Sequence, residues 1–344
     1  MTAKRQTSFF GEVRPNRGQR RTAGVTQRTI AVTGASGFVG EWTMRRLANV
    51  DGIRAVSFFE PGKPGLTDYS YIRHRMQEIR PFSVIHLAAI AAPSEAARDP
   101  RRAFDINLTG TLNLAESILR DSPETRLIFA GSSESYGRSF NRSNDPIQEE
   151  MALEPDTLYG VTKASADMLL AQMAGTGLEV VRFRPFNHTG PGQSETYVVS
   201  SFARQIARIE SGLQPAVIDV GNLEARRDFL DVRDVVEAYV SAATRKKSLP
   251  SGIALNLASG EARRIGDILN DLCSMSAFEI TVRQDAARMR ASDTPLATGD
   301  GRMASKYLGW RPAIRWGDTL RDVLQFWRAR MSPNLRGPEP TDSF

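Results

Sequence analysis

A glycine-rich turn between an apolar run and a helical pattern constrains this chain more than any other feature of its sequence. The run Arg28–Thr33 is rich in β-formers, and it enters Gly34-Ala-Ser-Gly37-Phe-Val-Gly40 before a helical pattern at 41–49. In such a unit the first glycine permits a tight turn, the second lets backbone approach a pyrophosphate, and the third lets the helix pack closely. The helix N-terminus adds free N–H groups for phosphates. We therefore predict a dinucleotide site formed by Gly34, Ser36, Gly37, Phe38, Val39 and Gly40.

Further apolar runs alternate with helical patterns along the first half of the chain. Alternation of this kind predicts a parallel sheet with helices on both faces, and continuous apolar strands are typical of a sheet buried on both sides. After Pro185 the pattern breaks into loops, helices and short strands. The fold class predicted is α/β: a Rossmann-type doubly wound parallel sheet with a smaller C-terminal α/β substrate lobe. The expected strands lie at 53–59, 83–88, 126–130, 179–184 and 254–257, and the helices at 68–80, 101–120, 157–175 and 231–243.

These patterns predict an interleaved domain organisation. Residues 28–185 are expected to form the NAD(P)-binding domain, with 231–258 returning to it. Residues 186–330 are expected to form the substrate lobe, and 331–344, rich in Pro and Gly, a loose tail. Residues 1–27 read as a disordered basic tail, poor in periodic apolar residues.

Charge and cysteine content exclude several classes of partner and site. Residues 1–28 hold seven basic residues and one acidic one, which accounts for the whole formal charge of +6. Basic character is thus a property of the tail, and we expect no nucleic-acid partner, although a transit peptide stays open. No apolar run is long enough to span a bilayer. The single cysteine, Cys273, permits no intramolecular disulfide, and the three histidines lack metal-ligand spacing, so no metal is expected. A cytoplasmic enzyme fits these features.

A Tyr-x-x-x-Lys pair supplies the candidate chemistry. Tyr159 and Lys163 lie one turn apart on a predicted helix, hence on one face. A neighbouring ammonium is expected to lower the pKa of the tyrosine so that it exchanges a proton with a carbonyl or alcohol oxygen. Ser132, at the end of the preceding strand, can hold the same oxygen. Glu60 follows the second strand at the spacing of a ribose-binding acid and tilts the choice toward NAD, with NADP open.

These residues together resemble the extended short-chain dehydrogenase/reductase family of NAD-dependent epimerases and dehydratases over about residues 28–330. The resemblance is carried by TGASGFVG (33–40), HLAA (86–89), NLTGTLN (107–113), SSESYG (132–137), YGVTK (159–163) and RPFNHTGPGQ (184–193). It implies an NAD or NADP cofactor, a nucleotide-sugar substrate and a homodimer formed through the Tyr–Lys helix. Relatives often have Asp at Gly65, which puts a polar adenine contact in doubt. The cofactor contacts implied are Leu66, Leu87, Ala88, Ala89, Asn107, Tyr159, Lys163, Phe186 and His188.

Two later segments, 184–213 and 220–236, resemble the GDP-sugar branch of that family. The resemblance implies NAD(P)H-dependent reduction of the C4 ketone of GDP-4-dehydro-6-deoxy-D-mannose to GDP-D-rhamnose, with Tyr159 as proton donor. Where the dehydratases have Asn-His-Glu-Ser-Pro-Arg, this chain has Asn-His-Thr-Gly-Pro-Gly at 187–192. Arginines suit the diphosphate because guanidinium groups bind phosphates bidentately. The implied substrate contacts are Ser133, Asn187, Val198, Arg227, Arg290 and Asp293.

Alternatives remain open at this stage. Glu134 could serve as the extra acid or base of a GDP-mannose 4,6-dehydratase. A 4-epimerase or a reductase forming the talose isomer uses the same residue types. The alternative outside the enzymes is a non-catalytic NAD(P)-sensing protein. Such proteins tend to lose the tyrosine or the lysine, whereas this chain retains both Tyr159 and Lys163.

Overall fold

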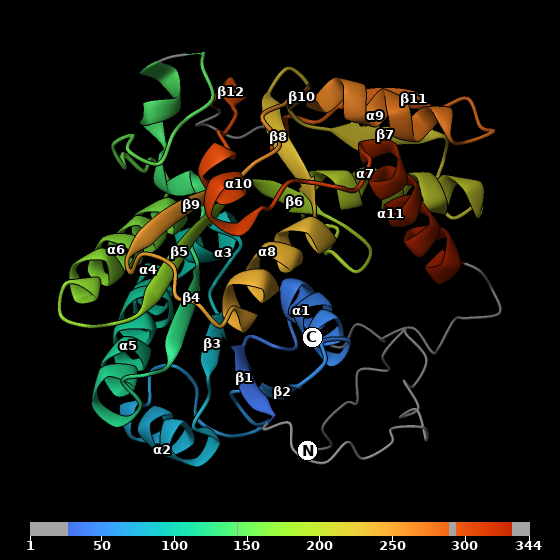
Figure 1. The fold of residues 1–344 in the computed structure, drawn as a ribbon. Coiled ribbons are helices and arrows are strands. Elements are labelled where there is room, and N and C mark those ends of the chain that lie inside the picture. Colours follow the sequence, from blue (N-terminus) through green and yellow to red (C-terminus); the bar gives the residue numbers. More distant parts are fainter. Residues whose placement is uncertain (1–26, 143, 289–293, 332–344) are drawn as a thin grey trace.

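A six-stranded, fully parallel sheet forms the centre of the molecule (Figure 1). The computed structural model describes residues 27–142, 144–288 and 294–331. The chain runs from β1 to β2 on one side and then crosses to β3 on the other, so the strand order reverses beside β1. Ligands of such sheets bind at the carboxyl ends of the strands at this reversal. In spatial order the strands are β2 (Ile53–Ser57), β1 (Arg28–Thr33), β3 (Ser83–His86), β4 (Arg126–Ala130), β5 (Val180–Pro185) and β9 (Ile253–Leu257).

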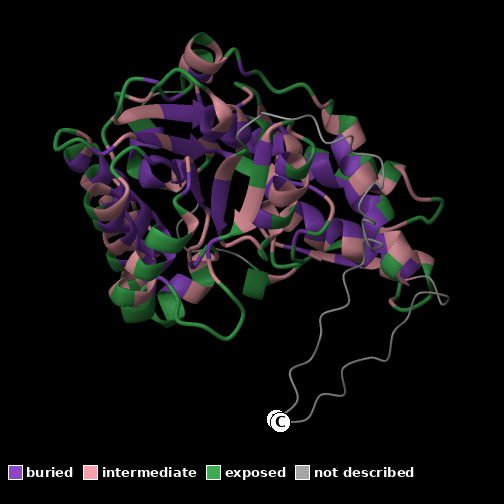
Figure 2. Cartoon of the chain, turned by 60° about the horizontal axis from the view of Figure 1, so that its bottom comes forward, coloured by how far each residue is buried: buried purple, intermediate pink, exposed green. Residues whose placement is uncertain are grey.

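Helices cover both faces of this sheet, which confirms the predicted fold class. Alternate residues of β1 face opposite ways: Ile30 and Val32 join one buried cluster and Ala31 joins the other. Figure 2 shows the resulting buried interior between exposed outer helix faces. One face packs α1 (Phe38–Ala48), α8 (Val232–Thr244) and α10 (Arg302–Leu308); the other packs α2 (Tyr69–Ile79), α5 (Gly110–Asp121) and α6 (Leu158–Ala174).

The predicted long helix at 101–120 is interrupted. After α3 (Pro93–Arg98), the chain forms α4 (Pro100–Phe104), a π-helical turn at Asp105–Thr109 and then α5. A π turn is rare and is often found at functional sites. Here it carries the buried Asn107 toward the loop that follows β3.

Two small sheets and three helices form the second lobe. β8 (Arg226–Asp231) is its centre and pairs with β6 (Asn187–Thr189), β10 (Ala262–Arg264) and β12 (Leu296–Ala297). β7 (Val217–Val220) pairs with β11 (Thr281–Gln284). An apolar cluster holds together α7 (Val198–Glu210), α9 (Ile265–Ser274) and α11 (Trp316–Met331).

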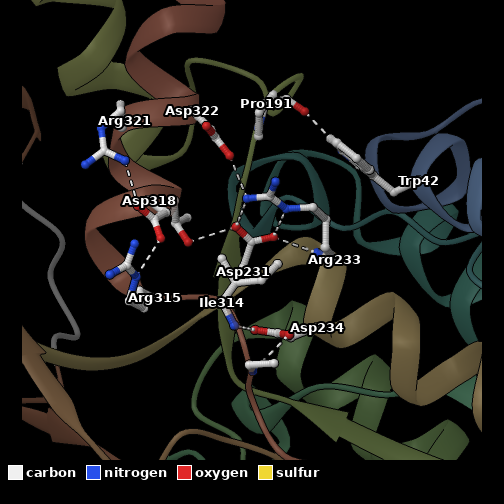
Figure 3. A network of polar contacts seen from close by, with 12 residues as sticks. Trp42, Pro191, Asp231, Arg233, Asp234, Ile314, Arg315, Asp318, Arg321 and Asp322 are labelled. Carbon is white, nitrogen blue, oxygen red and sulfur yellow. Dashed lines mark hydrogen bonds and ion pairs between the residues drawn. The ribbon is translucent and has the colours of Figure 1, made fainter.

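An ion-pair network joins the two lobes where β8 runs into α8 (Figure 3). Asp231 caps α8, accepts two bonds of 2.8 Å from the Arg233 guanidinium, and accepts a third from the Thr319 hydroxyl of α11. Arg233 also pairs with Asp322 of α11 at 2.8 Å. Removing either partner of an ion pair that includes a fully buried group is strongly destabilising. The network therefore ties α11 of the second lobe to the helix that packs on the main sheet.

Several expectations lie outside the described residues. They concern 1–26 of the predicted basic tail, most of the predicted loose C-terminal tail, and Arg290 and Asp293. Among the helices that the structure describes, none combines the length and the apolar character needed to cross a bilayer. Within the same residues, no group of three or more His, Cys, Asp or Glu side chains is arranged to hold a metal ion.

Candidate active site

A cavity of about 770 Å³ lies between the carboxyl ends of the main sheet and the second lobe. Most of the predicted site residues, from both lobes, line it. It is therefore where the cofactor and the substrate would meet. The predicted residues that line it are Gly34, Gly37, Phe38, Val39, Gly40, Leu87, Ala88, Ala89, Ser132, Ser133, Glu134, Tyr159, Phe186, Asn187, His188, Val198 and Arg227.

The glycine turn closes one end of this cavity, and its geometry excludes side chains. Gly34 has φ +69°, and a Cβ there would lie 2.8 Å from the Ala88 nitrogen. A Cβ at Gly40 would lie 2.0 Å from the Gly34 oxygen. Unlike α2 and α6, α1 has no side chain bonded to its first N–H groups. The turn thus leaves bare backbone and uncapped N–H groups at the cavity, which fits a dinucleotide pyrophosphate.

Buried hydroxyls position the end of β3 beside this turn. Thr33 Oγ1 accepts from the Leu87 and Ala88 nitrogens at 3.1 Å and lies 2.8 Å from His86 Nδ1. Burial, assisted by the Lys163 charge, lowers the pKa of His86 to about 3. The ring is therefore neutral, and it holds the strand end that lines the cavity.

Ser132, Glu134 and Tyr159 meet at the middle of the cavity. Ser132 follows β4 and caps the short helical turn Ser133–Ser135, with its Oγ accepting from the Glu134 nitrogen at 3.1 Å. The Ser132 side chain also lies close enough to Tyr159 to lower the pKa of its phenol. Glu134 Oε2 accepts from the Thr157 hydroxyl at 3.0 Å, and Thr157 is the cap of α6, the helix that carries Tyr159. The cap thus fixes the carboxylate and the start of the tyrosine helix together.

The protonation of Tyr159 differs from the expectation. Burial raises the pKa of Tyr159 above its usual range, the Glu134 charge raises it further, and the Ser132 hydrogen bond only partly offsets this. Lys163 was expected to lower it, but its Nζ donates to the Ala130 oxygen at 2.7 Å, and burial lowers the pKa of Lys163 to about 8. Burial is the largest cause of the raised pKa, because an ionised phenolate loses its hydration in the protein interior. Tyr159 is thus a protonated donor at neutral pH.

Comparisons with known proteins agree with this geometry. The family profile described as GDP-mannose 4,6 dehydratase matches residues 62–323. GDP-6-deoxy-D-mannose reductase of Pseudomonas aeruginosa is 35% identical over 89% of this chain and 99% of that protein. The solved structure of RMD from Pseudomonas aeruginosa complexed with NADPH superposes with a TM-score of 0.80 at 33% identity, covering 88% of this chain and all of that one. UDP-glucose 4-epimerase of Neisseria meningitidis serogroup C is 25% identical over 88% of this chain and 96% of its own.

The chain belongs to the GDP-mannose 4,6-dehydratase family of extended short-chain dehydrogenases/reductases. Its predicted family and cofactor class are thereby confirmed: it is an NAD(P)-dependent nucleotide-sugar enzyme. Which of the reactions in that class this chain catalyses has to be inferred from its own residues.

In this family member, the far end of the cavity is built by the second lobe. Asn187 and His188 come from β6, Val198 begins α7, and Arg227 comes from β8. Arg227 Nη1 donates to the Thr294 oxygen at 2.5 Å. The His188 Nδ1 lies 3.0 Å from the Phe186 oxygen, and burial lowers the pKa of His188, so the neutral ring presents Nε2 to its surroundings.

Other predicted residues do not line the cavity. Asn107 bonds the Ile90 backbone twice and the Thr162 hydroxyl once, so it fastens the loop after β3 to α6. Leu66 packs under Gly110. Ser36, Glu60 and Lys163 also lie outside the lining, although Lys163 is directly behind it.

Sequence reasoning missed two features of this site. Tyr197 lines the cavity, and its proximity adds to the raised pKa of Tyr159; it sits in a loop that carries no motif. Arg75 of α2 reaches Glu60 at 3.0 Å and Glu78 at 2.6 Å. Helix packing brings this arginine to Glu60 from 15 residues downstream, so the sequence next to Glu60 gives no sign of it.

Proposed function

We propose that this protein reduces the C4 ketone of GDP-4-dehydro-6-deoxy-D-mannose to GDP-D-rhamnose with NADH or NADPH. The observation that carries the proposal is that Tyr159, Ser132 and Glu134 line the same cavity as the uncapped α1 turn. The 35% identity to a GDP-6-deoxy-D-mannose reductase supports the substrate. Residues 28–185 with 231–258 would hold the cofactor, and 186–330 the GDP-sugar.

The residues of the chain divide the work of this reduction. The cofactor held at the glycine turn would supply the hydride for this reduction. Ser132 donates to the ketone oxygen and holds it against Tyr159, which delivers its proton to that oxygen as the alcohol forms. Lys163, whose pKa is lowered to about 8 by burial, can return a proton to the site. Gly34, Gly37 and the α1 N–H groups would bind the pyrophosphate, and Arg227 would bind the diphosphate of the sugar nucleotide.

A direct assay tests this proposal. Purified protein is mixed with GDP-4-dehydro-6-deoxy-D-mannose and NADH or NADPH, and loss of the reduced nicotinamide absorbance is followed. NMR of the product then distinguishes rhamnose from talose at C4. We expect cofactor oxidation in step with formation of GDP-D-rhamnose; an unchanged substrate with either cofactor would rule the reductase out.

One observation favours a second candidate, the 4,6-dehydratase. Glu134 lies close enough to raise the pKa of Tyr159, and Thr157 holds it in place. A carboxylate at this position could remove the C5 proton and return it to the departing C6 hydroxyl oxygen, so that water is lost. Incubation with GDP-mannose and catalytic NAD or NADP, without reductant, tests it. Formation of the 4-keto product would establish this activity, and recovered GDP-mannose would exclude it.

The protein is also proposed to be a homodimer through α6. Met168 of that helix is 63% exposed, so this apolar side chain is available for a contact with a second copy of α6. Sedimentation of the wild type and of Met168→Glu provides the test. A dimer that the glutamate dissociates supports the proposal, and a monomeric wild type refutes it.

A further inference from the structure

A second cavity, of about 1070 Å³, lies on the other side of β8 from most of the active-site lining. Its walls come from the loop after β9, the turn at Gly299–Gly301, α10 and the start of α11. Figure 1 shows α10 against β9 of the main sheet. Among the residues that the structure describes, no predicted cofactor or substrate contact lines this cavity. Its volume is enough for a small-molecule ligand.

The charge of this second cavity is opposite to that of the active-site cavity. Five cationic side chains line it against three acidic ones, Asp145, Glu261 and Asp300. In the active-site cavity, two arginines face three acids, Glu134, Glu195 and Asp219. Since the body of the chain carries no net charge, this concentration of cations is local. The cations are Arg263, Arg302, Lys306, Arg311 and Arg315.

Two of these cations are available to a ligand. Arg263, Arg302 and Arg315 pair with Glu261, Asp300 and Asp318. Lys306 and Arg311, in contrast, have no carboxylate within 4.0 Å among the described residues: Lys306 lies over the Tyr307 ring and Arg311 donates to the Ser305 hydroxyl at 3.2 Å. Both side chains are exposed. An exposed lysine and arginine on one cavity wall form the usual recognition pair for phosphate oxygens.

The wall of the cavity also contains two donors that lack acceptors. Arg263 Nε and Trp316 Nε1 are buried and have no hydrogen-bond partner among the described residues. They belong to one stack, with the Arg263 guanidinium carbon 5.2 Å from the centre of the Trp316 ring. A buried donor without an acceptor destabilises the fold, so such groups are rare unless a ligand or water completes them. Both nitrogens are themselves enclosed, so the contact of this wall with a ligand comes from the rest of the Arg263 guanidinium, which lines the cavity.

From these observations we infer a second ligand site, which binds a small molecule carrying a phosphate or diphosphate group. Lys306 and Arg311 bind its oxygens, and the Arg263–Trp316 stack forms the floor of the site. The site is separate from the cofactor and sugar-nucleotide cavity, so its occupant is an effector rather than a reactant.

Strand β8 connects this site to the active site. Asp228 of β8 accepts from the Ser259 nitrogen at 2.9 Å, the Gly260 nitrogen at 2.9 Å and the Gly299 nitrogen at 3.3 Å, all from the second cavity's walls. Its neighbour Arg227 lines the active-site cavity. Phe229, also in that lining, packs on the Trp316 ring at 5.5 Å. A ligand that shifts the loops on Asp228 would therefore shift Arg227, and such coupling is reciprocal.

Calorimetric titration with pyrophosphate tests the site without requiring turnover. The cavity variant is Lys306→Ala/Arg311→Ala, and the matched control, Lys246→Ala/Lys247→Ala, removes the same charge from an exposed loop elsewhere. Arg227→Ala removes the diphosphate contact of the active site instead. With saturating NADP present to occupy the glycine turn, we expect two equivalents of pyrophosphate on the wild type and the control, one at Arg227 and one in the second cavity. The cavity variant should lose one of them, with an affinity at least about tenfold weaker per cation removed, and Arg227→Ala should lose the other.

The outcomes separate this inference from the proposed reductase. The four side chains that the cavity variant and its control truncate are all exposed. The temperature of thermal unfolding should therefore be unchanged in both variants. Pyrophosphate binding to the cavity variant that equals the wild type overturns the second site, whatever the reductase assay shows. One equivalent that Arg227→Ala retains and the cavity variant loses supports the second site even if the substrate assignment fails.

Discussion

The cofactor end of the active-site cavity is built from backbone, whereas its sugar-nucleotide end is built from long side chains. At the first end, Gly34 and Gly40 leave no room for a Cβ, and α1 presents uncapped N–H groups. At the second, Asn187 and Arg227 reach in from β6 and β8 of another lobe. The difference teaches that one end depends on a local turn, while the other depends on how two lobes are held together.

The substitution with the largest expected effect lies between the two ends. Tyr159→Phe removes the proton donor and keeps the ring, so kcat should fall by about 10²–10⁴-fold. Because the hydroxyl is not part of either binding end, the affinities for cofactor and for GDP should stay near those of the wild type. Steady-state kinetics and cofactor titration measure both. Undiminished turnover would remove Tyr159 from the chemistry.

The backbone-built end is tested by Gly40→Ala. The new Cβ would lie 2.0 Å from the Gly34 oxygen, so the turn must open. We expect the free energy of unfolding to fall by about 3 kcal/mol, and cofactor affinity to fall with it. Gly65→Ala is the matched control, since nothing lies within 4 Å of a Cβ there. Equal stability of the two variants, measured by chemical denaturation, would contradict a backbone-built end.

The side-chain-built end is tested by Arg227→Ala. Loss of one charge-assisted contact to a diphosphate should raise KM for the sugar nucleotide about tenfold or more, with cofactor affinity unchanged. Arg226→Ala, at an exposed neighbour outside the cavity lining, is the control. If cofactor affinity falls instead, the two ends are not separable and the comparison fails.

Local sequence patterns predicted the strand–turn–helix of the cofactor end well, but not the contacts of two side chains that depend on tertiary packing. The strand–turn–helix at 28–49 is determined by neighbouring residues, so the structure has it nearly as expected. Lys163 was expected to act beside Tyr159, but its Nζ donates to the Ala130 oxygen at 2.7 Å and the residue lies outside the cavity lining. Asn107 was expected at the cofactor, but a π turn aims it at Ile90. Neither outcome can be read from spacing, since each depends on which groups tertiary packing leaves unpaired.

The Glu60–Arg75 pair shows how tertiary packing alters the interpretation of a local motif. Its test has the smallest expected effect. The motif alone reads Glu60 as a ribose acid that repels a 2′-phosphate. The structure places the Arg75 guanidinium 3.0 Å from it, with Glu78 at 2.6 Å, so two carboxylates compete for one largely buried cation. Glu60→Gln removes one negative charge and frees a guanidinium edge. The ratio of kcat/KM for NADPH to that for NADH should therefore rise, by about tenfold. Glu78→Gln, which relieves the same arginine from the side of α2, should raise the ratio less. If the ratio is unchanged in both variants, these side chains do not determine the preference for the ribose or its 2′-phosphate. The backbone would then form the whole cofactor-binding part of the cavity.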